Sequence, residues 1–329
     1  MTIQRNLTTR LIGTLNVDNQ DFDKFSRQCS EMKDLGYYGV YFNNIFFTFE
    51  NLDFSCDEED ILYREDQHLL VRRSKQDLQR IKTILENNNL VMPSAHFLSM
   101  LPEPGCVPES MFIPHEKILD MAQFLGAKRL TTHIGWISVP TAAKAKERPT
   151  LAEKLENEEI DYYEYSDLLR KAYGKDKMIQ DSLIIYKHLA KEAAKRGIDI
   201  TIETACGELY SINLKPELMI DFIRQVGEDN IGICIDAGHC HFNGLDVAEV
   251  IRKCGSYFWE THFHDNFGRK DRHNPVGIGT INWLEVIKTM NEIGYQGEVI
   301  FEQDDYVTNH KNWMLFIAQV EKDLQQGII

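Results

Sequence analysis

The sequence contains no run of about 18 consecutive apolar residues, so no transmembrane helix is expected. Its first residues, MTIQRNLTTRL, lack the basic-then-apolar pattern of a secretory signal, which makes a cytoplasmic location the default expectation. Basic side chains are in the minority, because 36 Lys and Arg stand against 51 Asp and Glu and give a net charge of −15. Such a surface repels polyanions, which disfavours a broad nucleic-acid interface.

Short cofactor and disulfide motifs are also missing. The seven cysteines are odd in number and show no CxxC spacing, which indicates reduced thiols in a cytosolic protein. No GxGxxG motif follows an early strand, and this weakens a doubly wound dinucleotide-binding sheet as the fold. There is no internal repeat or low-complexity tract. What remains is an ordinary globular composition, 43% hydrophobic and 26% charged.

Short apolar segments alternate with amphipathic segments along the whole chain. The predicted strands are 10–15, 38–43, 90–97, 128–134, 198–203, 230–236, 258–263 and 298–302. The clearest predicted helices are 22–36, 78–89, 178–197, 216–227 and 281–294, with apolar residues at helical spacing. Strands that alternate with helices form a parallel sheet, and eight such units predict a closed (β/α)8 TIM barrel, with a doubly wound sheet as the alternative.

The connections between these segments differ in length. Helix-to-strand turns are short and often carry glycine, whereas several strand-to-helix loops are long. In a barrel the long loops lie on the C-terminal rim, where active sites are found. We therefore expect one TIM-barrel domain over 1–329, with loop insertions at about 44–73 and 135–176. The charged segment 135–176 is a candidate lid, a contact within a homo-oligomer, or simply a solvated insertion.

Histidine and acidic residues recur at the ends of the predicted strands. They are His96, His133, Glu203, Asp236 with His239, His262 with His264, and Glu302, and a late loop adds Asp271 and His273. A single polar residue at a strand end carries little information, but successive barrel strands would deliver all of these side chains to one rim. So many buried carboxylates and imidazoles would be costly without a cation. Mixed nitrogen and oxygen ligands suit Zn, Mn, Fe or Co, with Mg as a further option, so the pattern predicts a divalent metal site.

These strand ends carry recognisable motifs: THIG, IETACG, CIDAGH, the HxxD step in HFHD, DRHxxxGxG followed by INW, and FEQ. With them the chain resembles the xylose isomerase-like TIM barrels, which include sugar isomerases and epimerases, inosose dehydratases and endonuclease IV. The resemblance covers about residues 90–303 and is sparse before that. The motifs are specific for the superfamily and much less specific for one reaction.

The resemblance implies roles for individual residues. Glu203, Asp236, His262 and Glu302 match the four ligands of the metal that sugar isomerases and epimerases share. His239 matches a histidine that contacts substrate in epimerases and binds metal in the nuclease, and His264 stands where many relatives carry Lys. The further ligand positions of endonuclease IV are matched by His96, His133, Asp271 and His273. The resemblance thus leaves room for a site with two or three metal ions.

Proton transfer next to a carbonyl is the chemistry that this residue set predicts. A divalent ion would chelate a ketose carbonyl and hydroxyl and stabilise the enediolate, while Glu203 and Glu302 remove and return a proton. His239 would hydrogen-bond the developing oxyanion. The aromatic residues Phe97 and Trp136 are candidate pocket walls, with loop packing as the alternative.

A sugar isomerase or epimerase acting on a small carbohydrate is therefore the predicted function. An inosose dehydratase-like lyase, an endonuclease IV-like phosphodiesterase and a non-catalytic carbohydrate-binding relative are the alternatives. The acidic insertions within 53–67 and 153–165 disfavour the nuclease, because a nuclease must grip phosphates. The basic group Arg269, Lys270 and Arg272 is a candidate phosphate site or, as we favour, a solvated loop face.

Overall fold

A computed structural model gives the structure of the chain. It describes residues 7–15, 21–42, 60–65, 69–97, 100–102, 107–137, 168, 171–206, 212, 215–303 and 310–328. Most of the predicted insertion at 135–176 lies outside these residues. Within the predicted insertion at 44–73, the structure shows two antiparallel strands, β3 (Asp60–Glu65) and β4 (Leu69–Ser74).

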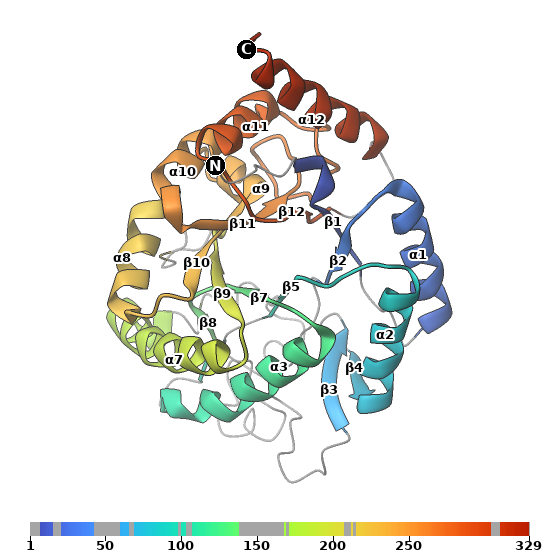
Figure 1. The fold of residues 1–329 in the computed structure, drawn as a ribbon. Helices are drawn as coiled ribbons and strands as arrows, with labels where there is room; N and C mark the ends of the chain where they lie inside the picture. Colours follow the sequence, from blue (N-terminus) through green and yellow to red (C-terminus); the bar gives the residue numbers. More distant parts are fainter. Residues whose placement is uncertain are drawn as a thin grey trace.

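Eight parallel strands form one sheet in the order β2-β1-β12-β11-β10-β9-β7-β5 (Figure 1). The strands are β1 (Leu11–Thr14), β2 (Gly39–Tyr41), β5 (Ser94–His96), β7 (Arg129–Thr132), β9 (Asp199–Glu203), β10 (Ile231–Asp236), β11 (Phe258–Phe263) and β12 (Val299–Phe301). Each lies within one of the eight predicted segments. The two edge strands also approach each other, since the Val40 amide donates to the Val91 carbonyl and the His96 amide to that of Phe42. The TIM-barrel prediction is confirmed.

Helices surround the strands (Figure 1). They are α1 (Phe22–Leu35), α2 (Lys75–Asn87), α3 (Phe112–Leu125), α7 (Lys175–Lys195), α8 (Pro216–Val226), α9 (Ala237–Phe242), α10 (Val247–Cys254), α11 (Trp283–Glu292) and α12 (His310–Gln325). Local sequence sets their ends. In α1, for example, Asp21 caps the first turn and Gly36 ends the helix at a φ of 88°. No described helix has the length and apolar character needed to cross a membrane.

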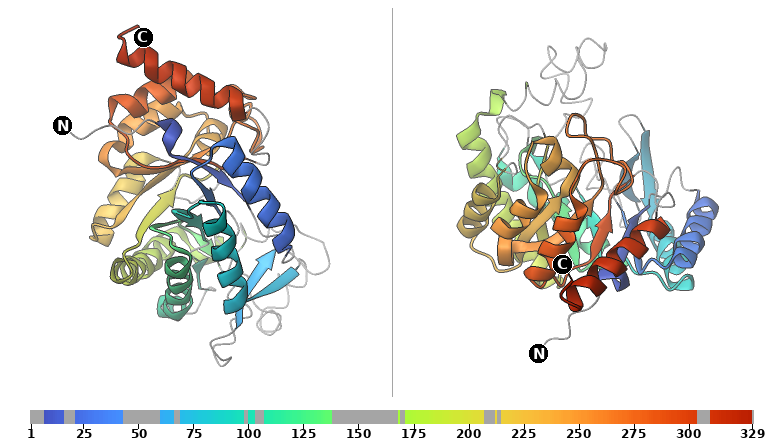
Figure 2. Two further views of the ribbon diagram at one scale, coloured as in Figure 1. Left: turned by 45° about the vertical axis from the view of Figure 1, so that its right-hand side comes forward. Right: turned by 90° about the horizontal axis from the view of Figure 1, so that it is seen from above.

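The first and last described elements lie together. The 3-10 helix η1 (Leu7–Thr9) sits beside α12, and the Leu7 amide donates a 2.7 Å hydrogen bond to Glu321 Oε1 (Figure 2). Arg10 extends this contact by donating to the backbone carbonyls of Gly297 and Tyr295 near β12. These bonds attach the start of the chain to the last βα unit, which brings β1 and β12 into register.

The apolar core lies mainly between the strands and the helices. A small separate apolar cluster of Ile12, Tyr41 and Ile300 occupies the barrel interior between β1, β2 and β12. Ile300 is the register partner of His262 on β11, and the Tyr41 ring meets the His262 ring edge-on at 4.7 Å. The rest of this interior layer is polar, which is where the candidate site begins.

Candidate metal centre

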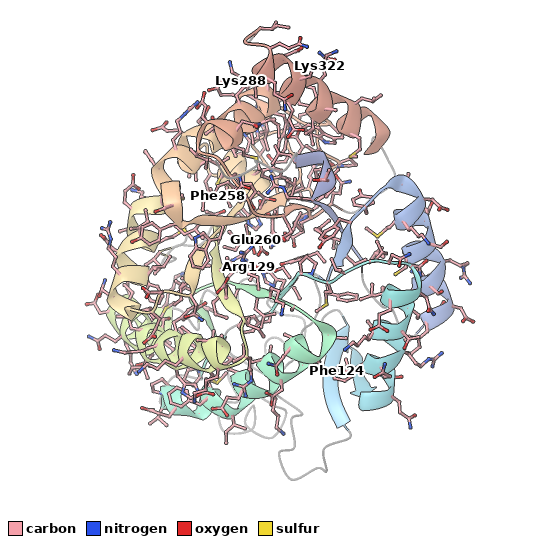
Figure 3. The ribbon with its side chains drawn as sticks, in the orientation of Figure 1. Phe124, Arg129, Phe258, Glu260, Lys288 and Lys322 are labelled. Atoms are coloured by element: carbon pink, nitrogen blue, oxygen red, sulfur yellow. The ribbon has the colours of Figure 1, made fainter. Side chains whose placement is uncertain are left out.

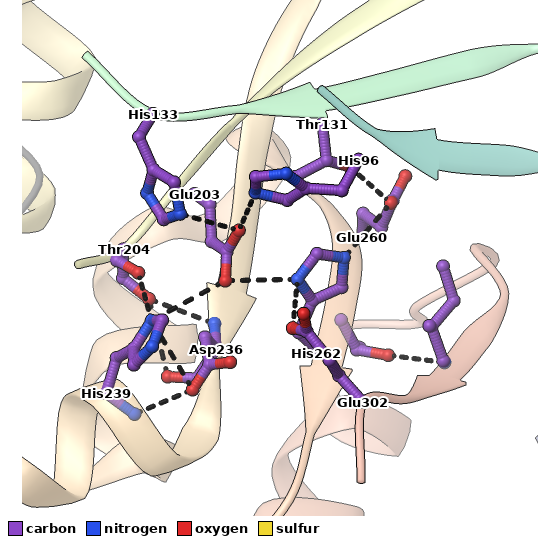
Figure 4. Close-up of polar contacts among 12 residues, drawn as sticks. His96, Thr131, His133, Glu203, Thr204, Asp236, His239, Glu260, His262 and Glu302 are labelled. Carbon is purple, nitrogen blue, oxygen red and sulfur yellow. Dashed lines mark hydrogen bonds and ion pairs between the residues drawn. The ribbon is translucent and has the colours of Figure 1, made fainter. Parts of the chain in front are cut away.

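The C-terminal ends of six neighbouring strands carry the polar side chains that the sequence singles out (Figure 4). In β10 and β11 the register pairs Asp236 directly with His262, and in β9 and β10 it pairs Glu203 with Cys234. Parallel pairing therefore holds side chains from distant parts of the chain at the same height in the barrel. All of the strand-end residues are buried, and His262 and Asp236 have no exposed surface.

Four of these residues form one compact group: Glu203, Asp236, His262 and Glu302. Each offers one ligand atom, and the four atoms lie within 4.8 Å of one another. His262 Nδ1 lies 3.0 Å from Glu203 Oε1 and 2.9 Å from Glu302 Oε2. These are the four residues for which the resemblance implies metal ligation, and the barrel brings them together.

The contacts at the centre of this group are ion pairs that lack hydrogen-bond geometry. Neither ring nitrogen of His262 has a hydrogen-bond partner, and neither has Glu302 Oε2, although the atoms approach so closely. Buried polar groups normally find such partners. Atoms that face a common point without hydrogen-bond geometry suit a shared cation, and one imidazole with three carboxylates is a donor set that Zn or Mn accepts. The residues thus fit a divalent metal ion.

Histidine charges oppose the effect of burial in this group. Burial tends to raise the pKa of both glutamates, but His262 and the neighbouring histidines together outweigh burial, so the pKa of Glu203 falls well below its usual range and that of Glu302 falls to about 2. Burial tends to lower the pKa of His262. The surrounding acidic groups, including Cys234 and Tyr41 besides the glutamates, nevertheless raise it well above its usual value. The carboxylates are therefore held in the anionic form that ligates metals.

A second group lies beside the first and consists of His239, His264, Asp271 and His273, whose ligand atoms also lie within 4.8 Å of one another. His239 Nε2 and His273 Nε2 each lie 3.3 Å from Asp271 Oδ2. Burial tends to lower the pKa of His273, but Asp271 and Glu302 raise it to about 10. This arrangement fits a second cation.

His264 links the two groups. Its Nε2 lies 2.9 Å from Asp236 Oδ1, and its ring stacks on His273 with centroids 4.0 Å apart. A Cβ atom at Gly238 would lie only 1.9 Å from the His264 ring, so the glycine leaves the space that this ring occupies. The structure therefore places His264 against a candidate ligand rather than in the group of four.

A third group joins Glu203 to the ends of β5 and β7. His96 Nε2 and His133 Nε2 lie 3.0 Å and 3.2 Å from Glu203 Oε2. Burial lowers the pKa of His133 to about 4, even though Glu203 acts in the opposite direction. A neutral imidazole is the form that binds metal, so this group too has a suitable donor set.

The loop between β11 and α11 carries Asp271 and His273, and Asp265 holds it in place. The Asp265 carboxylate accepts hydrogen bonds from the Trp283 indole at 2.7 Å and from the Gly277 amide at 3.0 Å. His273 has a φ of 44°, in the left-handed region that few non-glycine residues adopt. Its Nδ1 bonds the Glu302 carbonyl oxygen at 2.9 Å, which joins the loop to β12.

Two residues that the sequence analysis did not single out matter to this site. Asp265 stands in the sequence only as the end of the HxxD step, and none of the motifs named above includes Glu260. Glu260 is fully buried on β11, two residues before His262, so the two side chains share the inner face. Strand alternation in FWETHFHD was the signal that would have found it.

The remaining sequence predictions concern two aromatic residues and one basic group. Phe97 is buried in the apolar core, with its ring edge-on to that of His115 at 6.0 Å, which matches the packing alternative. The side chain of Trp136 lies outside the described part of the chain. Arg269, Lys270 and Arg272 are exposed, as expected of a solvated loop face.

The chain is similar in sequence to several known proteins over part of its length. Among curated proteins, the chain is 32% identical to the D-psicose 3-epimerase of Ruminiclostridium cellulolyticum over 117 residues, which is 35% of this chain and 38% of the epimerase. It is 26% identical over 149 residues to a protein of Malacoplasma penetrans described as a probable endonuclease 4, covering 38% of this chain and 52% of that protein. The matched part of the chain thus spans about half or less of the length of these relatives.

Solved structures match over greater lengths. A D-tagatose 3-epimerase-like protein has a TM-score of 0.62 at 15% identity, covering 97% of this chain and 100% of that chain. A D-psicose 3-epimerase determined with D-fructose has a TM-score of 0.57 at 14% identity, covering 89% and 84%. At such identities the likeness shows the shared fold alone.

The family of the chain is shown by a match to a family model, which is longer than the matches to the curated relatives. The family model described as xylose isomerase-like TIM barrel matches residues 52–320, well over half of the chain and beyond the span of the motifs. The fold and the motifs at the strand ends agree with this match. The chain belongs to the xylose isomerase-like TIM barrel family.

Proposed function

We propose that this protein is a metal-dependent isomerase or epimerase of a sugar or sugar derivative. The observation that carries the proposal is the approach of two buried carboxylates, Glu203 from β9 and Glu302 from β12, to His262 Nδ1. The two strands are separated in the sheet by β10 and β11, so the carboxylates reach the same point from different directions. The printed names of the relatives, D-psicose 3-epimerase and D-tagatose 3-epimerase-like protein, support a ketose as substrate.

Glu203, Asp236, His262 and Glu302 would hold the metal ion. When bound, a divalent ion supplies Lewis acidity that favours the enediolate form of an α-hydroxyketone. Glu302 and Glu203 act as the acid–base pair, one removing the proton beside the carbonyl and the other returning it. His239 hydrogen-bonds substrate oxygen; its Nδ1 contacts the Thr204 carbonyl oxygen at 2.7 Å, which directs Nε2 away from that carbonyl.

The second and third groups of candidate ligands favour an endonuclease IV-like phosphodiesterase as a second candidate function. A site with two or three ions requires more ligands than the first four residues. The further imidazoles and carboxylate would come from His96, His133, Asp271 and His273. Against this candidate stands the net charge of −15, since a nuclease must bind several phosphates. We therefore expect little incision of abasic DNA. Incision at low enzyme concentration that is lost in His133→Ala would favour the nuclease instead.

Solvent exchange separates the candidates. The metal-free protein is reloaded with Mn²⁺ or Co²⁺ and incubated in D₂O with a panel of ketoses and inososes, and the products are followed by NMR. An isomerase or epimerase places deuterium on the carbon beside the carbonyl, whereas a dehydratase also accumulates an absorbing unsaturated ketone. A phosphodiesterase does neither, because its reaction touches no C–H bond. Turnover without any solvent deuterium would count against the proposed acid–base pair.

A further inference from the structure

Glu260 is a fully buried carboxylate beside the candidate metal centre. Figure 3 shows it near Arg129, in the middle of the barrel. Glu260 Oε1 accepts hydrogen bonds from Ser94 Oγ at 2.8 Å and Thr131 Oγ1 at 2.5 Å, which come from β5 and β7 on the other side of the barrel. Arg129 Nη1 lies 3.5 Å from Glu260 Oε2. Residues of two strands, β5 and β7, thus hold one carboxylate of β11 in the barrel interior.

The same oxygen faces His262. Glu260 Oε1 lies 3.6 Å from His262 Nε2, on the opposite side of the ring from the nitrogen that approaches Glu203 and Glu302. This distance is beyond a hydrogen bond, and His262 Nε2 has no hydrogen-bond partner. His262 therefore has carboxylates on both sides, two at Nδ1 and one at Nε2.

When one ring nitrogen of a histidine binds a metal, the other ring nitrogen carries the proton. A neutral imidazole that ligates a cation through Nδ1 carries its proton on Nε2, and that N–H needs an acceptor inside a buried site. Histidines that bind metals generally donate this proton to a carboxylate, a carbonyl or water. Glu260 Oε1 is the carboxylate oxygen that the described residues place on this side of the ring.

We propose that Glu260 is a positioning residue, which accepts the Nε2 proton of His262 and so orients Nδ1 toward the metal. This inference rests on the proposed function, because it presupposes a metal ion at His262. It also gives a role to the hydroxyls of Ser94 and Thr131 and to Arg129, which hold the carboxylate where the ring requires it.

Affinity measurements on matched variants test the proposal. Glu260→Gln keeps the shape of the side chain but removes its charge, and Glu298→Gln is the control, since Glu298 Oε2 lies at the same 3.5 Å from Arg129 Nη1 and no contact with His262 is recorded. Co²⁺ binding to the full-length metal-free proteins is followed by absorbance. We expect the dissociation constant to rise roughly 10- to 100-fold in Glu260→Gln, the usual loss for such a partner, and about twofold at most in Glu298→Gln.

A second measurement needs no variant. In the Zn²⁺-loaded wild-type protein, ¹⁵N-labelled histidine shows by NMR which ring nitrogen carries the proton. We expect a protonated Nε2 at His262, with slow exchange of this proton with solvent. Metal ligation through Nε2 would overturn the proposal even if Glu260→Gln failed to fold.

The outcomes separate this inference from the proposed function. A wild-type protein that binds Co²⁺, together with unchanged affinity in Glu260→Gln, would overturn the role of Glu260 and leave the metal centre standing. Equal losses of Co²⁺ affinity in Glu260→Gln and Glu298→Gln would assign the effect to Arg129 and would also overturn the role of Glu260. A wild-type protein that binds neither metal would remove both proposals.

Discussion

At the scale of single residues, His262 is the group around which the other charges of the site are arranged. An isolated buried carboxylate is strongly disfavoured, so Glu203 and Glu302 would be costly without a compensating charge. His262 supplies it, and the pKa directions show that the charged form of His262 stabilises each glutamate, although the two glutamates repel each other. His262 Nδ1 therefore faces both glutamates at the point that we assign to the metal.

Replacing either glutamate tests its proposed double role. Glu203→Gln and Glu302→Gln keep the shape and one ligating oxygen but remove the basic carboxylate, so turnover should fall by roughly a hundredfold or more. Metal should still bind, though more weakly. Steady-state rates and Co²⁺ titrations measure the two effects separately, with the surface variant Glu249→Gln as control. An unchanged rate in Glu302→Gln would remove Glu302 from the mechanism.

At the scale of elements, the loop between β11 and α11 shows how a site can depend on a residue that touches no ligand. Asp265 receives hydrogen bonds from Gly277 and Trp283, and Asn274 and Asp265 exchange two backbone hydrogen bonds. These bonds fold the loop back over the barrel, so that Asp271 and His273 reach His239 and His264. The loop therefore links β11 to the second group of candidate ligands.

Gly279 lies in this loop against Asp265 and Asn266, with no room for a side chain. A Cβ atom there would lie 2.1 Å from Asp265 Oδ1 and 2.3 Å from the Asn266 carbonyl oxygen, so Gly279→Ala must displace the loop. We expect activity to fall about tenfold or more, as for a misplaced catalytic group, with a smaller loss of stability. Kinetics and thermal unfolding check this, with the exposed Ile278→Ala as the control in the same loop. Full activity in Gly279→Ala would show that the loop does not position the site.

At the scale of the whole molecule, folding and metal binding should be separable. The apolar core between the strands and the helices is extensive and does not include the candidate ligands. A barrel of this size has enough buried apolar surface to fold by itself. Chelation should therefore abolish turnover while the far-UV circular dichroism stays unchanged, and Mn²⁺ or Co²⁺ should restore the activity. Full activity in a demonstrably metal-free preparation would contradict the metal assignment.

The stability of the metal-free protein should also depend on pH. Burial lowers the pKa of His115 in α3 to about 3, against about 6.5 in an unfolded chain. Below pH 6.5 the unfolded chain binds a proton at this residue that the folded protein does not, so the contribution of His115 to the free energy of unfolding falls as the pH falls toward 3. His133 acts in the same direction. His262 and His273, whose pKa values are raised on folding, contribute in the opposite direction.

Chemical denaturation at pH 7.5 and 5.5 measures this effect. We expect His115 to account for a loss of about 1 kcal/mol between the two values, which follows from the depressed pKa. His115→Leu should reduce the loss relative to the wild-type protein under the same conditions. An equal pH dependence in wild type and His115→Leu would show that His115 does not titrate differently on folding.

The sequence pattern was enough to predict the barrel and the convergence of the strand-end residues, and the resemblance to the family singled out the four central ones. Strand and helix periodicity are local properties, so each of the eight strands lies within a predicted segment. Equivalent ends of parallel strands share one rim, which is why Glu203, Asp236, His262 and Glu302 were expected to meet before any distance was known. The role of these residues as metal ligands remains a prediction.

Only the tertiary structure decided the arrangement around those four residues. No local sequence pattern predicts the hydrogen bonds that close the barrel between 38–42 and 91–96. The same is true of the contacts that bring the 265–283 loop onto the second group. The hydroxyls that reach Glu260 lie more than a hundred residues away in the chain. Such contacts depend on the curvature of the closed sheet, which sets how far side chains reach across the barrel. The sequence determined which residues face the interior, and the closed barrel determined which of them touch.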